Sequence, residues 1–197
     1  VRKSLVKLQA AHEESKTVTR SETMKTLRAT MNAIIEDVSV VAREAKLRLE
    51  NLDLANVTAR EKDGAGPGSS NERTRSAITS SLKMKLKTQM AEFQDLRAKL
   101  TSEYKEVVER RYFAVAGETP DAETLDHLVE TGESETIFQK AIMEQGRGQI
   151  LDTVAEIQER HDAVRELERK LLELHEIFLD MSVLVEAQGE MLDNIES

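Results

Sequence analysis

The sequence predicts an all-α protein that consists of an antiparallel three-helix bundle, a partly helical linker and one long helix with a seven-residue repeat. A third of the 197 residues are charged and only 3% are aromatic, which suits long helices with narrow apolar stripes. Apolar residues recur in steps of three and four in three separate stretches and again in the C-terminal stretch. No stretch shows the sustained alternation of a half-buried strand, so we expect no β-structure.

Three amphipathic helices make up the expected bundle, and the first, from Leu5 to about Val18, looks truncated at its start. The second begins near Ser21, a residue suited to the N-cap, and runs for about 30 residues. The third follows a break rich in glycine at residues 63–71, which separates two antiparallel helices. The apolar stripe of the second helix consists of Met24, Leu27, Met31, Ile34, Val38, Val41, Ala45, Leu49 and Leu52. The stripe of the third helix consists of Ile78, Leu82, Leu86, Met90, Phe93, Leu96, Leu100, Tyr104 and Val107.

The C-terminal helix carries the most regular pattern of the chain. Its steps alternate between three and four without a fault over more than four heptads, which indicates a left-handed coiled coil. This seam consists of Val164, Leu167, Leu171, Leu174, Phe178, Met181, Val185, Gln188, Leu192 and Ile195. Gln188 is its one polar member, either a tolerated interruption or a residue that fixes the register of the strands because a buried amide needs hydrogen-bond partners. We therefore divide the chain into a bundle (1–111), a linker (112–153) and a coiled-coil segment (154–197).

Charge and composition exclude several classes of protein. The net charge of −9 resides in residues 150–197, so we expect no binding to nucleic acid. The absence of cysteine excludes disulfides and fits a reducing compartment. No run of about 18 apolar residues and no signal peptide is present, so we expect this fragment to be soluble. Both ends look like cuts, and a membrane anchor can lie beyond either.

Candidate catalytic and metal sites all lack a necessary part. His12 and His175 each begin a pattern like that of zinc proteases but lack the second histidine. Gly64 to Gly68 lacks the Gly-Lys-Ser/Thr of a phosphate loop. Acidic pairs such as Glu13 and Glu14 are explained by a solvated helix face. We expect no enzyme activity, no cofactor, no metal and no small-molecule substrate.

The C-terminal residues resemble the SNARE motif of a syntaxin (Qa-SNARE). The resemblance rests on residues 159–168, 171–181 and 184–196, above all on Glu-Leu-His followed by Phe, Asp-Met and Gln-Gly-Glu from Glu173 to Glu196. Further segments, Arg73 to Arg75, Tyr104 to Phe113 and Gln145 to Asp152, resemble the plant syntaxins of secretion and cytokinesis, the group that includes KNOLLE. The resemblance covers essentially the whole chain.

This resemblance implies a role for each part of the chain. Gln188 would be the central layer that meets an arginine of a synaptobrevin-type R-SNARE and glutamines of SNAP-type (Qb/Qc) partners, and the other seam residues would be hydrophobic layers. The bundle would be the regulatory Habc domain, which can fold back on the SNARE helix in a closed state recognised by Sec1/Munc18-type proteins. Leu125 and Asp126 fall where the family's linker carries Leu-Glu, whose disruption favours opening.

The expected function is therefore that of an interaction protein of membrane traffic, which assembles with partner SNARE helices for vesicle docking and membrane fusion. The full-length protein would be tail-anchored at the cytosolic face of the plasma membrane or cell plate. By this resemblance we expect the anchor and the second half of the SNARE motif to follow these 197 residues. The alternative is a structural homo-oligomer in which identical copies pair through the same heptads. A helical-bundle enzyme would need inward-facing sets of carboxylates and histidines, which the pattern does not show.

Overall fold

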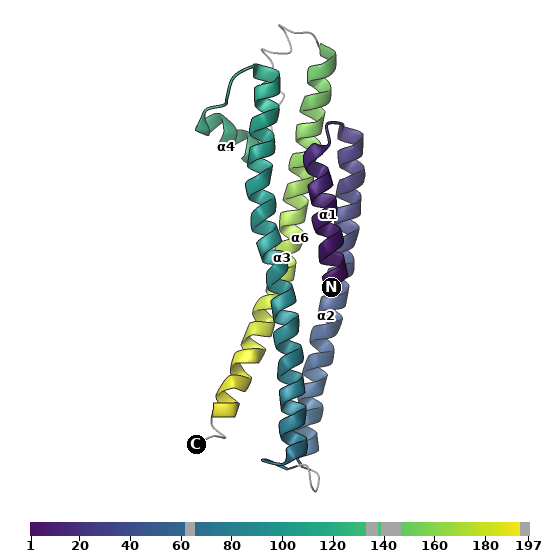
Figure 1. Cartoon of the computed structure of the whole chain (residues 1–197), viewed down its shortest axis with the longest axis vertical. Coiled ribbons are helices and arrows are strands. Elements are labelled where there is room, and N and C mark those ends of the chain that lie inside the picture. The colour runs from purple at the N-terminus through teal and green to yellow at the C-terminus, as the bar shows by residue number, and fades with distance from the viewer. Residues whose placement is uncertain (62–65, 133–137, 139–146, 194–197) are drawn as a thin grey trace. The chain divides into compact units, whose positions relative to one another are not determined.

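The computed structural model confirms the all-helical fold. It describes residues 1–61, 66–132, 138 and 147–193, and for 147–149, 178 and 181–193 it describes the backbone alone. The helices are α1 (Arg2–Thr17), α2 (Ser21–Arg60), α3 (Ser70–Ala116), α4 (Ala122–Thr131) and α6 (Arg147–Asp193) (Figure 1). Within these ranges there is no β-strand. None of the described helices is long and apolar enough to cross a membrane.

Two of the helices are longer than the apolar pattern indicates. α2 has 40 residues and α3 has 47. The start of α3 lies inside the predicted break, because Ser69 and Glu72 cap it: the Ser69 hydroxyl accepts a hydrogen bond from the Glu72 amide at 3.2 Å, and the Glu72 carboxylate accepts one from the Gly68 amide at 2.6 Å. Such reciprocal capping satisfies amides that the first turn of a helix leaves unpaired.

The chain divides into two compact units, and α2, α3 and α6 each contribute one part to each unit. Unit 1 contains Val1–Arg2, Asp37–Gln94 and Leu172–Ser197, and unit 2 contains Lys3–Glu36 and Asp95–Leu171. Unit 2 therefore holds nearly all of α1 and the whole of α4 in addition to its parts of the three long helices.

Within unit 1, α2 and α3 are antiparallel. Asn56 donates a hydrogen bond to Thr79 at 2.9 Å, and Arg60 pairs with Glu72 at 2.5 Å, so later residues of α2 meet earlier residues of α3. Lys83, whose side chain is only 1% exposed, forms an ion pair with Asp53. Polar and charged side chains thus occupy part of the buried face of this hairpin.

Within unit 2, α1 lies along α3. His12 contacts Glu103 at 2.6 Å between Nε2 and Oε2, and Lys99 donates to Glu13 at 2.9 Å. The buried apolar residues that α1, α2 and α3 contribute to this unit are Leu5, Leu8, Ala11, Met24, Leu27, Met31, Ile35, Leu96, Leu100, Tyr104, Val107, Val108 and Val115.

The predicted stripe of α2 needs correction at Ile34, Val41 and Leu52. Ile35 and Ala42 are fully buried, whereas Val41 is 46% and Leu52 41% exposed, and Ile34 is only half-buried. Strict alternation of three and four steps corresponds to 3.5 residues per turn, but an α-helix has about 3.6, so the buried face moves ahead of such a pattern along a long helix.

The predicted stripe of α3 is wrong at its N-terminal end. Ile78 is 56% and Leu82 44% exposed, while Thr79 and Lys83 are buried in their place. Helix geometry places positions 79 and 83 on the face that Leu86 and the following core residues define, whatever residue type stands there. The hydrogen bond of Thr79 and the ion pair of Lys83 offset the cost of burying these polar groups.

Candidate helix-packing interface

The N-terminal half of α6 is a buried helix of unit 2. Val164 is 8%, Leu167 1% and Leu171 0% exposed, so three of the predicted seam residues face the other helices of this unit. Leu174, the next seam residue, is 0% exposed within unit 1. Phe178, Met181, Val185, Gln188 and Leu192 lie on α6, but their side chains are outside the described residues, as is Ile195 altogether. The role of Gln188 therefore stays a prediction.

The buried face of α6 extends further toward its N-terminus than the predicted seam. Ile150, Ile157 and Arg160 are 5%, 0% and 3% exposed. They continue the seam backward from Val164 at heptad-compatible steps of four, three and seven. The heptad spacing of these positions is present in the sequence. It is hard to recognise there because Arg160 is charged and Thr153 is polar.

α2 binds the acidic side of α6 through one arginine. The Arg28 guanidinium donates to Glu166 at 2.8 Å and to Glu159 at 3.1 Å, and it lies 3.8 Å from Asp162. Burial alone would lower the pKa of Arg28, but the hydrogen bonds to Glu166 and Glu159 outweigh it and raise that pKa. Burial likewise works against the charge of Glu166, yet the bond from Arg28 outweighs it, and the pKa of Glu166 is lowered. Both groups are therefore held in their charged forms.

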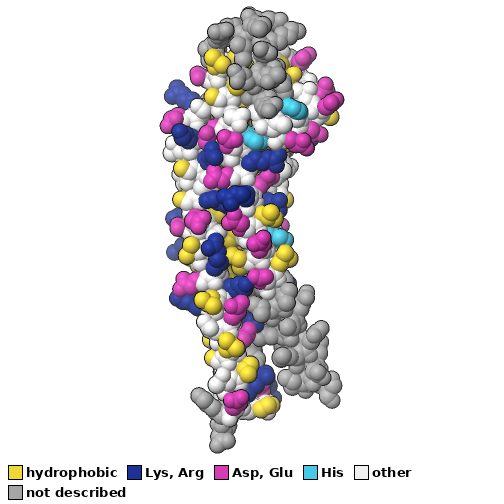
Figure 2. Space-filling model, turned by 180° about the vertical axis from the view of Figure 1, so that it is seen from behind, with side chains coloured by type: hydrophobic (Ala, Val, Ile, Leu, Met, Phe, Trp, Pro, Cys, Tyr) yellow, Lys and Arg dark blue, Asp and Glu magenta, His cyan; other side chains and the backbone are white. Residues whose placement is uncertain are grey.

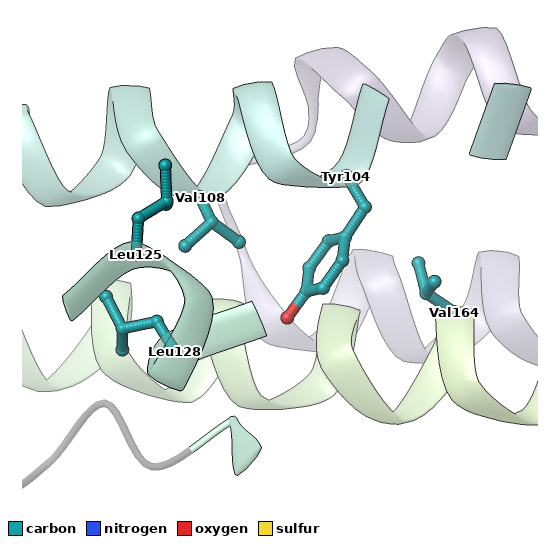
Figure 3. Close-up of a cluster of buried hydrophobic side chains, with 5 residues drawn as sticks. All are labelled: Tyr104, Val108, Leu125, Leu128 and Val164. Carbon is teal, nitrogen blue, oxygen red and sulfur yellow. The ribbon is translucent and has the colours of Figure 1, made fainter. Parts of the chain in front are cut away.

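The short helix α4 packs against both α3 and α6. Asp121 caps its start by accepting a hydrogen bond from the Thr124 amide at 2.7 Å, and Gly132 ends it with a left-handed φ of 71°. Leu125 and Leu128 point from α4 into a cluster with Tyr104 and Val108 of α3 and Val164 of α6 (Figure 3). The α6 side chains His161 and Arg165 contact the Glu130 carbonyl at 3.2 Å and 3.0 Å.

The two linker residues singled out in the sequence differ in their surroundings. Leu125 is 7% exposed within the cluster just described, whereas Asp126 is exposed and forms an ion pair with Lys105 of α3 at 2.6 Å. Both side chains therefore attach α4 to α3, and Leu125 also packs with the seam residue Val164.

In unit 1, α6 contacts α2 through charged groups. A groove is lined by Ser39, Arg43, Lys46 and Glu50 of α2 and by Glu173, Glu176, Ile177 and Asp180 of α6. Lys46 forms an ion pair with Asp180. Side chains at the surface shown in Figure 2 likewise mix apolar groups with charges of both signs. Among the described residues no cluster of His, Asp and Glu could hold a metal ion.

Comparison with known proteins finds two family models along the chain. Residues 1–142 match the family model described as Syntaxin, and residues 155–197 match the model described as SNARE domain. A helical protein whose C-terminal helix carries a heptad seam and matches the SNARE domain belongs to the class of SNARE proteins. Because the syntaxin model matches more than half of its residues, the chain belongs to the syntaxin family. Members of this family are SNARE proteins and not enzymes.

Similar proteins include several plant syntaxins. Syntaxin-132 of Arabidopsis thaliana is 60% identical over 195 residues, which are 99% of this chain and 64% of the relative. Syntaxin-121 of Oryza sativa subsp. japonica is 56% identical over 174 residues, or 88% of this chain and 53% of the relative. The syntaxin-related protein KNOLLE of Arabidopsis thaliana is 43% identical over 197 residues, or 100% of this chain and 62% of the relative. The chain thus spans less than two thirds of these relatives, and no solved structure matches it.

Proposed function

We propose that this protein is a Qa-SNARE whose α6 assembles with helices of a synaptobrevin-type R-SNARE and SNAP-type partners, and that this assembly drives vesicle docking and membrane fusion in secretion or cytokinesis. The observation that carries the proposal is the heptad seam of α6 within the segment that matches the SNARE domain. The choice of process rests on the resemblance to the plant syntaxins of secretion and cytokinesis, and the relatives found by comparison are plant syntaxins. In the full-length protein the site of action would be the cytosolic face of the plasma membrane or cell plate.

The proposed function includes regulation by fold-back of the bundle. Val164, Leu167 and Leu171 are buried against other helices of unit 2, and these are residues that would form layers with partner helices. One stripe cannot be buried in both ways at once, so the two states exclude each other and partners shift the balance between them. A Sec1/Munc18-type protein that recognises the folded-back state would act on this balance.

Binding of partner helices tests the SNARE assignment. The chain, extended by the second half of the SNARE motif and mixed with soluble R-SNARE and SNAP-type helices, should form a complex of all partners that circular dichroism and size-exclusion chromatography detect, because coiled-coil stability accumulates along the seam. The Gln188→Leu variant should still bind but lose selectivity for register, because an apolar seam position accepts shifted alignments. Unchanged selectivity would leave Gln188 as a tolerated polar residue.

The alternative function, a structural homo-oligomer, makes a different prediction for the isolated chain. If the chain is a homo-oligomeric coiled coil, sedimentation equilibrium should show a stable multimer whose mass does not change when partner helices are added. That result would contradict the SNARE assignment.

The linker residues test the fold-back. In the double variant with Leu125→Ala and Asp126→Ala, α4 keeps Leu128 but loses the Leu125 side chain from the cluster with Val164 and the ion pair with Lys105. Amide exchange between Val164 and Val185 should become faster, and mass spectrometry after exchange measures it. The matched control carries Glu123→Ala and His127→Ala, both at exposed positions of α4, and should exchange like the unchanged chain. Equal exchange in all three proteins would count against the folded-back state.

A further inference from the structure

A buried group of charged side chains in unit 2 lies outside the predicted SNARE layers. It consists of Arg111 of α3, Glu156 and Arg160 of α6, and the backbone carbonyl of Val18 between α1 and α2, and we call it the Arg160 cluster. The Glu156 side chain is 0% exposed, that of Arg160 4% and that of Arg111 22%. Carboxylates and guanidinium groups are almost never this buried unless they are paired.

Each member of the Arg160 cluster has at least two partners. Glu156 accepts from Arg111 Nε at 3.1 Å and from Arg160 Nε at 2.7 Å. The Val18 carbonyl accepts from Arg111 at 2.6 Å and from Arg160 at 3.1 Å. The two arginines therefore bridge α6 to the turn between α1 and α2, and the planar guanidinium, with several donors in fixed directions, suits this bridging.

The cluster occupies a seam position of α6. Arg160 lies four residues before Val164 and three after Ile157, so it continues the heptad pattern as a polar member. A shift of α6 by one heptad would move Glu156 and Arg160 together and put Gln149 and Thr153, or Ala163 and Leu167, at their places. None of these residues carries a charge, so Arg111 and the Val18 carbonyl, which do not lie on α6, would lose their charged partners, which is costly.

Burial of Arg160 is itself unfavourable, so the partners must compensate. Removal from water lowers the pKa of Arg160, and the neighbouring Glu156 carboxylate opposes this effect. Two cations share one anion here, and the Val18 carbonyl supplies the remaining acceptor. The arrangement is therefore satisfied only when α3, α6 and the turn after α1 are all in place.

We propose that the Arg160 cluster fixes the register of α6 in the folded-back state and holds it there, separately from the SNARE layers. This proposal rests on the fold-back proposed above. It differs from that proposal in the residues that act. The members of the cluster all precede Val164, the first predicted layer, and Arg111 lies on α3 and not on α6. A change at Arg111 can therefore open the folded-back state while every residue that partner helices would contact stays the same.

The test is amide exchange in the 197-residue chain with three variants. Arg111→Gln removes the charged hydrogen bonds of Arg111 to Glu156 and to the Val18 carbonyl and leaves those of Arg160. Arg111→Lys keeps the positive charge but lacks the several fixed donors of a guanidinium group, and Arg110→Gln removes the neighbouring charge at an exposed position. Loss of a buried, charge-assisted partner should raise the exchange rate of α6 amides from 157 to 171 by about 10- to 100-fold in Arg111→Gln. Arg111→Lys should fall between this variant and the unchanged chain, and Arg110→Gln should match the unchanged chain.

Amides around Leu8 and Leu100 show whether the effect is confined to α6. They should keep their protection in Arg111→Gln. Two results would overturn the proposal. If exchange in Arg111→Gln accelerates equally around Leu8, Leu100 and in α6, Arg111 merely stabilises the whole bundle. If the α6 amides of Arg111→Gln exchange no faster than those of the control Arg110→Gln, the cluster does not hold α6 in place. Because exchange needs no partner, failure of the cluster is distinguishable from failure of the SNARE assignment. Where partner helices bind, their association with Arg111→Gln should speed up by a similar factor, since the open fraction limits binding.

Discussion

Unit 1 and unit 2 are built from the same three long helices but bury different residues. In unit 2, α1 and α4 are added, and the buried positions of α2 and α3 are almost all apolar. In unit 1, Thr79 and Lys83 are buried, while exposed apolar side chains include Val40, Val41, Leu47, Leu52, Leu54, Val57, Ile78, Leu82 and Met84. An apolar stripe on a helix therefore marks a face that can be buried, and the number of neighbouring helices decides whether it is.

The largest contrast between the units should appear in two leucine substitutions. Leu100 of unit 2 is 1% exposed, whereas Leu54 of unit 1 is 66% exposed. Leu100→Ala should lower the free energy of unfolding by about 2 to 5 kcal/mol because it leaves a cavity, and Leu54→Ala should change it by less than about 0.5 kcal/mol. Urea unfolding followed by circular dichroism measures both. Similar losses would show that Leu54 is covered in solution.

The polar face of unit 1 can be examined at its buried ion pair. Lys83→Met should lower the free energy of unfolding by about 1 to 3 kcal/mol, because the Asp53 carboxylate loses this partner in a partly buried position. The double variant with Asp53→Leu should recover most of the loss, since an apolar pair needs no desolvation of charge. Lys85→Met, at an exposed position of the same helix, is the control. A double variant no more stable than Lys83→Met would mean that Asp53 has a separate structural role.

Substitutions at two glycines of unit 2 should distinguish the cost of backbone strain from the cost of a packing clash. Gly117 and Gly132 have left-handed φ values of 76° and 71°, but a Cβ at Gly132 would lie 2.6 Å from His161 Cγ, while one at Gly117 meets nothing within 4 Å. Gly117→Ala should cost about 1 kcal/mol of unfolding free energy from strain, and Gly132→Ala should cost about 1 kcal/mol more because His161 must move. Thermal unfolding measures the difference. Equal costs would show that His161 moves aside freely.

Much of this fold follows from periodicity alone, but not its polar buried groups. The all-helical class, the start of α2 and the seam from Val164 to Leu174 follow from local spacing, which a helix converts directly into a face. The burial of Arg160 and Lys83 could not be predicted in the same way. Whether a charge can be buried depends on partners such as Arg111 and Asp53, which lie far away in the sequence.

The seam of α6 illustrates the same limit. Extended back to Ile150, it carries three polar residues, Thr153, Arg160 and Gln188, and the last two are separated by four heptads. Gln188 was evident because apolar residues precede and follow it in the repeat, whereas Arg160 lies where the repeat begins. If both proposals hold, one helix uses two polar positions for two registers: Arg160 for packing on its own bundle and Gln188 for packing with partners.

The smallest effect expected is a pH dependence from unit 2. Burial lowers the pKa of His12 below its ordinary value of 6.5, although the Glu103 hydrogen bond and the charges of Glu103 and Glu13 oppose this and Lys16 adds to it. The unfolded chain then binds more protons than the folded one, so His12 contributes stability that is present above pH 6.5 and is lost as the pH falls through 6.5 toward the folded-state pKa. His12→Gln should flatten this slope in urea unfolding measured across that range. Stability that instead rises on acidification would mean that the Glu103 contact dominates and that His12 is preferentially charged in the folded bundle.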